Sequence, residues 1–234
     1  MELKKIKILS NSASLLPIIS LLFLLSCSQQ SKNINKELKN TIEIGDYSFD
    51  FPANFKLVKE QGVDSYVGRI EDNNNRFEFD FGLYTSTLTE SPEEYLKEGY
   101  WRFDLSERFM KPNITYDKNN EPKVEVLSIR QANRKDSLIG KGCDYIAHCQ
   151  HEKITFDFPI YLPAETKAYY FKTDTIDGIY QKVVYAKDPK KGITGMYLAK
   201  LGNKRALSLV AHHLSCKEQE MVLKIFSTAK YLKN

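Results

Sequence analysis

The sequence predicts an α+β fold in which helices cover an antiparallel β-sheet, an arrangement like an α/β/α sandwich. Short segments of alternating polar and apolar residues recur from residue 41 onward, turn residues separate them, and two segments begin with helix-capping residues. Connections this short favour antiparallel pairing over repeated βαβ units. The 13 Phe and 14 Tyr provide apolar area for a core and exclude a disordered chain.

The clearest strand is residues 76–81, where three Phe alternate with three charged residues and so share one face. Residues 153–158 repeat this design. Further strands are predicted at 47–51, 66–70, 123–130, 167–172, 179–186, 194–200 and 205–211. Many of them are separated by turn residues, namely Asp72–Asn75, Asp177-Gly178, Asp188-Pro189 and Gly202-Asn203.

Two helices are predicted. The first begins with Ser91 as the cap and Pro92 at the first helical position, and runs to about Phe109. We expect Leu96, Tyr100 and Phe103 to face inward and Trp101 to lie in the core. The second helix begins at a capping box formed by Ser215 and Glu218. One stripe of it is apolar and predicted to be buried: Met221, Val222, Ile225, Phe226, Ala229 and Leu232.

The N-terminus has the pattern of an export signal. Three Lys in residues 1–14 precede the apolar run of residues 15–25, and small and polar residues follow around Cys27. Eleven residues of helix span about 16 Å, roughly half of a bilayer's hydrocarbon core. The run is therefore a poor transmembrane helix.

Leu24-Leu25-Ser26-Cys27 resembles the lipobox of bacterial lipoproteins. The resemblance implies that Cys27 receives a diacylglyceryl group, that cleavage follows Ser26, and that acyl chains then hold the protein on the membrane. Two or three buried chains anchor a protein almost permanently. The alternative is an ordinary signal peptide with an incidental cysteine. Ser28, rather than Asp, after the cysteine implies transfer to the outer membrane, facing the periplasm.

These features divide the chain into a signal peptide (1–26), a lipidated cysteine with a flexible tether (27–40) and one α+β domain (41–234). The tether is polar and poor in aromatic residues. Removing residues 1–26 takes three Lys and one Glu from a chain of net charge +4, which leaves +2. A nearly neutral domain lacks the concentrated basic face of a nucleic-acid-binding protein. We expect no nucleic-acid partner.

Both ends of the predicted domain resemble the PsbP-like α/β/α sandwich. The strand Tyr47-Ser48-Phe49-Asp50-Phe51 ends in Pro52 and is followed by Phe55, and residues 205–215 form a strand that runs into the last helix. Segment 111–165 departs from that family. The resemblance implies the sandwich fold and an accessory binding role in a membrane-associated complex.

Cysteine and histidine residues cluster in residues 143–151. If this segment is a strand, His148 points away from the face that holds Cys143, Cys149 and His151. Cys143 and Cys149 then lie about 20 Å apart, too far for a shared metal or a disulfide. We therefore predict buried cysteines and surface histidines, with no metal site and no cofactor.

Once Cys27 is lipidated, three cysteines remain in an oxidising compartment: Cys143, Cys149 and Cys216. One pair can form there, and the sequence does not select it. Cys216 lies in the first turn of a helix, where a thiol pKa can fall, and His212 and His213 precede it. Simple packing of Cys216 at the helix start is the favoured interpretation, so no catalytic residue is predicted.

Tyrosines gather in the predicted C-terminal strands: Tyr169, Tyr170, Tyr180, Tyr185 and Tyr197. Two interpretations stand. They line a groove for a peptide, glycan or partner protein, or they cover strand edges and outer faces. The sequence as a whole predicts a lipid-anchored, non-enzymatic envelope protein that binds a partner protein or a small ligand in the periplasm. An envelope enzyme with a Cys/His-based or cryptic active site is the alternative, and an inert structural lipoprotein is the third.

Overall fold

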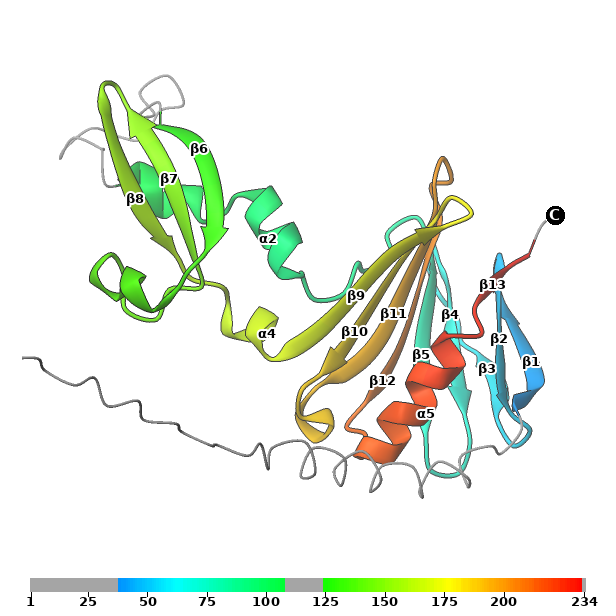
Figure 1. Ribbon diagram of the computed structural model, residues 1–234. Helices are drawn as coiled ribbons and strands as arrows, with labels where there is room; N and C mark the ends of the chain where they lie inside the picture. The colour runs from blue at the N-terminus through cyan, green and yellow to red at the C-terminus, as the bar shows by residue number, and fades with distance from the viewer. Residues whose placement is uncertain (1–37, 108–123, 233–234) are drawn as a thin grey trace, which may run out of the picture.

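The computed structural model describes residues 38–107 and 124–232, so the predicted lipidation site at Cys27 lies outside it. Thirteen strands in these residues form three antiparallel sheets (Figure 1). The largest sheet has the strand order β3-β4-β5-β12-β11-β10-β9. In that order its strands are Lys56–Lys59, Tyr66–Glu71, Arg76–Gly82, Ala206–His212, Ile193–Lys200, Ile179–Ala186 and Tyr169–Ile176.

Two three-stranded sheets accompany it. One has the order β1-β2-β13, with strands Leu38–Ile44, Tyr47–Pro52 and Lys230–Tyr231. The other has the order β6-β7-β8, with strands Val124–Gln131, Tyr145–His151 and Ile154–Ile160. The α-helices in the described residues are α2 (Pro92–Glu98), α3 (Arg102–Glu107), α4 (Ala164–Lys167) and α5 (Cys216–Phe226). The same residues contain two short 3-10 helices, η2 (Arg134–Leu138) and η3 (Pro189–Lys191).

The predicted α/β/α sandwich is wrong, because the protein is mostly β-sheet and its large sheet does not lie between two helical layers. On one face, α5 shares the cover with the β1-β2-β13 sheet (Figure 1). Phe51 of β2 packs edge-on against Phe77 of β5, with ring centroids 5.3 Å apart. A second sheet therefore occupies a place that the sequence assigned to a helix.

The first predicted helix is two short helices in the structure. The capping box of Ser91 and Glu94 starts α2 as expected. Gly99 ends it, because this residue adopts a left-handed conformation (φ 78°) and caps the last turn. The chain then turns into α3, which leaves Tyr100 and Phe103 exposed, contrary to expectation. The last residues of the predicted helix lie outside the described part of the chain.

The two halves of that helix pack their apolar side chains against the β6-β7-β8 sheet, while Glu94 of α2 also contacts the large sheet. Trp101 and Leu105 are buried against Cys149 and Phe158, and Leu96 packs beside them, partly buried. This small core is separate from the core of the large sheet. Trp101 therefore lies in a core, as predicted, although not the one expected.

The core of the large sheet follows the aromatic alternation of the sequence. Phe77, Phe79 and Phe81 of β5 are all buried on one face. Helix α5 buries Val222, Ile225 and Phe226 on them, and Phe226 meets Phe77 with ring centroids 6.5 Å apart. The helix ends at Phe226, earlier than predicted, because residues 230–231 pair with β2 as a strand.

The structure also contains strands that the sequence did not reveal. Strand β1 begins at Leu38, inside the segment predicted as tether, and β3 and β13 have only four and two residues. No helix in the described residues has both the length and the apolar character needed to cross a membrane.

Candidate functional site

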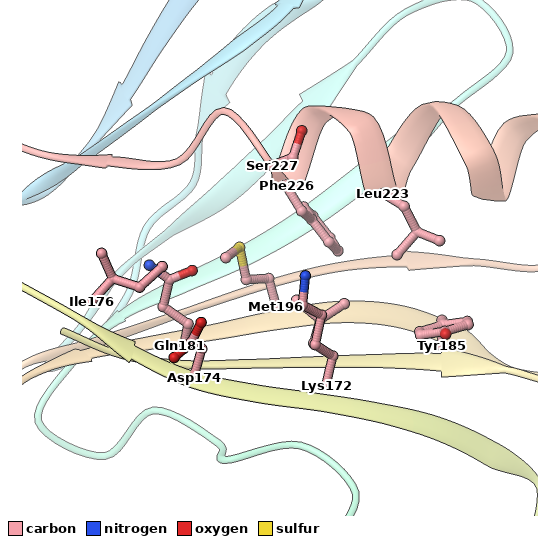
Figure 2. A pocket seen from close by; sticks show the side chains of 10 residues that line it. Lys172, Asp174, Ile176, Gln181, Tyr185, Met196, Leu223, Phe226 and Ser227 are labelled. Carbon is pink, nitrogen blue, oxygen red and sulfur yellow. The ribbon is translucent and has the colours of Figure 1, made fainter.

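A hollow of about 280 Å³ lies between α5 and the inner face of strands β9, β10 and β11; we call it the helix–sheet pocket (Figure 2). Leu223 and Phe226 point from α5 toward the sheet, and Met196 and Tyr185 lie below them (Figure 2). The residues that line it are Lys172, Asp174, Ile176, Gln181, Val183, Tyr185, Met196, Leu223, Phe226 and Ser227.

Strand alternation places these side chains together. A two-residue turn, Asp177-Gly178, joins β9 to β10, and both residues have positive φ (51° and 73°). That turn pairs Ile176 with Ile179 and fixes the register of the whole hairpin. Every second residue of each strand therefore faces α5, which brings the charged pair Lys172 and Asp174 to the rim of the pocket.

The lining of the helix–sheet pocket is mostly apolar with a few polar groups. Val183, Met196 and Phe226 form its floor and wall, and Gln181 and Ser227 add hydrogen-bonding groups. Ligand sites in proteins have this composition, and a volume near 300 Å³ is at the small end of their range. The geometry suits a small amphipathic molecule.

Two other hollows are larger than the helix–sheet pocket. One of about 450 Å³ lies between α5 and the start of β1, and six of its ten lining residues are polar or charged. The other, of about 390 Å³, contains His212 and His213 with Glu78 and Glu218. No group of three His, Cys, Asp or Glu in the described residues could hold a metal ion.

A buried ion pair lies on the opposite face of the large sheet. Lys182 of β10 has only 1% of its side chain exposed, and its Nζ donates to Glu94 Oε2 of α2 at 2.5 Å. Tyr180 donates to the other oxygen of Glu94 at 3.3 Å. Burial disfavours the charged form of Glu94, but hydrogen bonds from Lys182 and the Ser91 backbone outweigh it and lower the pKa of Glu94. This group fastens α2 to the sheet.

Strand β7 separates the clustered cysteines and histidines. Cys149 is buried, and burial raises the pKa of its thiol, whereas His148 is exposed and lies 2.8 Å from Asp157. Cys143 precedes the strand, and neither cysteine forms a disulfide in the structure. A buried thiol with a raised pKa is a poor nucleophile.

Cys216 is exposed at the first position of α5 and is also a free thiol. The two nearby histidines have other partners. His213 Nδ1 lies 3.1 Å from the carbonyl oxygen of Lys190, and His212 Nε2 lies 3.9 Å from a Glu78 carboxylate oxygen. The local geometry therefore does not assemble a Cys–His pair at this helix start.

The five tyrosines divide between the two faces of the sheet. Tyr185 lines the helix–sheet pocket and stacks on Tyr170, with ring centroids 5.3 Å apart. Tyr180 and Tyr197 pack together on the other face, where burial and the neighbouring Glu94 raise the pKa of Tyr180 to about 12. The Tyr169 hydroxyl accepts the Ile193 N–H at 3.3 Å. Of these five tyrosines, only Tyr185 lines the helix–sheet pocket.

Sequence reasoning missed most of the pocket, although one signal for it was present. The predicted strand 179–186 has eight residues and follows the Asp177-Gly178 turn, so its antiparallel partner should extend back from residue 176. The prediction stopped that partner at residue 172 and so omitted Asp174 and Ile176. No local pattern could have indicated that Leu223 and Phe226 would lie opposite them.

No protein-family model matches this chain, and a search of curated proteins finds no match either. The function must therefore be argued from the residues themselves.

Proposed function

We propose that this chain is a lipid-anchored, non-enzymatic envelope protein that binds a small amphipathic ligand in the helix–sheet pocket. The observation that carries the proposal is the pocket itself. It has an apolar floor, two hydrogen-bonding side chains (Gln181 and Ser227) and exposed charged residues at its rim. The separated cysteines support a binding role over a Cys/His enzyme.

The anchor part of the proposal rests on the sequence around Cys27. A charged region, an apolar run and Ser26 before the cysteine form the pattern that a lipoprotein requires. Acyl chains on Cys27 would attach the domain to the outer membrane, with the pocket in the periplasm.

The anchor is tested by fractionating cells that produce the Cys27→Ser variant. We expect the variant to leave the membrane fraction, because its only acyl attachment is gone. Cys216→Ser is the matched control and should stay in the membrane fraction like the wild type. Retention of the Cys27→Ser protein would contradict lipidation at this residue.

The pocket is tested with Val183→Trp, which places an indole inside it. Ligand-observed NMR titrations with hexanamide and benzyl alcohol as probes should detect binding to the wild type and at least a tenfold weaker affinity for the variant, about 1.4 kcal/mol. Lys204→Trp, in an exposed turn away from the pocket, controls for the added aromatic ring. Equal binding to all three proteins would rule out this pocket as the site.

A further inference from the structure

The last strand of the large sheet, β9, leaves one edge of its backbone unpaired in the described part of the chain. It has eight residues, whereas β3 at the opposite edge has four. Lys172, Thr173, Asp174, Thr175 and Ile176 are all exposed. Strand β9 lies at the border of the sheet (Figure 1). A long exposed edge strand is a template for another strand.

The hairpin register shows which backbone groups of β9 are available. Ile176 and Ile179 flank the two-residue turn and therefore form a hydrogen-bonded pair. Every second residue of β9, counted back from Ile176, forms the same kind of hydrogen-bonded pair with β10. The Lys187 N–H donates to the carbonyl of Ala168 in the same series. The backbone N–H and C=O groups of Phe171, Thr173 and Thr175 consequently point outward, away from β10. Of these, the Thr175 N–H donates a hydrogen bond to Asp174 Oδ1 at 2.7 Å.

The charges on this edge are self-complementary. If two copies pair antiparallel about a two-fold axis at Thr173, Lys172 of each copy lies opposite Asp174 of the other. Tyr170 then lies opposite Ile176, an aromatic and β-branched combination that stabilises strand pairs. The hydrogen-bonded positions of this register are residues 171, 173 and 175, the three whose backbone groups point outward.

The same charges disfavour the neighbouring registers of the two paired β9 strands. A slip of two residues in either direction places Lys172 opposite Lys172, or Asp174 opposite Asp174, and like charges directly opposite each other are destabilising. Charged residues on an edge strand usually prevent pairing. Here the opposite signs, two residues apart, permit one symmetric register.

We propose that β9 is a dimerisation edge whose partner is β9 of a second copy of this chain, paired antiparallel about Thr173. The two large sheets then join into one continuous sheet with an isologous interface. Asp174 releases the Thr175 N–H and pairs with Lys172 of the second copy. Both residues line the helix–sheet pocket, so each pocket adjoins the interface.

The geometry is tested by cysteine cross-linking of the full chain. In the proposed register the two Thr173 Cα atoms lie about 5.5 Å apart, within the range of a disulfide. The two Thr175 Cα atoms are offset by four residues, about 14 Å along the strands. Under mild oxidation, Thr173→Cys should give a reducible dimer on non-reducing electrophoresis. Thr175→Cys and the wild type control for random collision and for the native cysteines.

The charge pattern gives an independent test by sedimentation of the full chain. Lys172→Asp places two carboxylates opposite each other and should weaken dimerisation about tenfold, since each dimer contains two such pairs. Adding Asp174→Lys restores opposite signs and should restore the wild-type affinity. Equal cross-linking of Thr173→Cys and Thr175→Cys, a monomer at all concentrations, or failure of the second substitution to rescue the first would each overturn the proposal.

Discussion

At the scale of single residues, the most unusual group is the buried ammonium of Lys182. Its side chain is 1% exposed, while that of its partner Glu94 is 31% exposed. Removal of one partner from a fully buried pair costs about 3–5 kcal/mol. Because Glu94 retains contact with solvent, we expect a smaller loss here.

Lys182→Met should lower the free energy of unfolding by about 1–3 kcal/mol, measured by urea denaturation. The variant keeps the length of the side chain but leaves Glu94 without its ammonium. The double variant Lys182→Met with Glu94→Gln should lose less than the sum of the two single losses, because no unpaired charge remains. Strictly additive losses would show that the two residues do not interact.

The same pair predicts how stability depends on pH. The pKa of Glu94 is below its ordinary value of 4.5 in the folded protein, so the unfolded chain binds more protons in that range. The stabilisation by Glu94 is present above pH 4.5 and is lost as the pH falls toward its folded pKa. Lys182→Met should reduce this part of the acid sensitivity.

At the scale of elements, glycines determine where strands and helices stop. Gly45 forms the turn between β1 and β2 with φ 58°, and a Cβ added there would lie 2.4 Å from the Phe81 ring. Gly202 also has a positive φ, of 83°, but no atom lies within 4 Å of an added Cβ. The two positions thus share the backbone requirement and differ in packing.

Gly202→Ala should lower the free energy of unfolding by about 1 kcal/mol, because alanine disfavours the left-handed backbone conformation. Gly45→Ala should cost at least about 1 kcal/mol more, because the methyl group also displaces a buried ring. Thermal unfolding of the two variants beside the wild type gives the comparison. If both substitutions cost the same, Phe81 does not restrict the β1–β2 turn.

The limits of sequence-based prediction also lie at this scale. Alternation placed Phe77, Phe79 and Phe81 on one face, and the Ser215–Glu218 capping box located the start of α5, because both signals are local. Gly99 was an equally local signal, but the predicted helix from Ser91 to about Phe109 took no account of it. Strand β13 has only two residues and pairs with β2, which lies far away in the chain, so it has no local signal of its own.

At the scale of the whole molecule, the fold class failed for one reason. The prediction assumed that helices would cover both faces of the sheet. Instead, Phe49 and Phe51 belong to a second sheet that packs on the core of the large one. The helices on either side of Trp101 pack against the β6-β7-β8 sheet. The helix–sheet pocket is likewise a product of tertiary structure. Residues about 50 positions apart, such as Lys172 and Leu223, meet there only after folding.

Native mass spectrometry of the protein purified from its own membranes tests the claim that the helix–sheet pocket holds a small ligand. We expect the wild type to carry a small molecule that denaturation releases, and the Val183→Trp variant to carry none. Lys204→Trp should resemble the wild type. A wild-type protein with no bound small molecule, or the same molecule on Val183→Trp in equal amount, would contradict the claim.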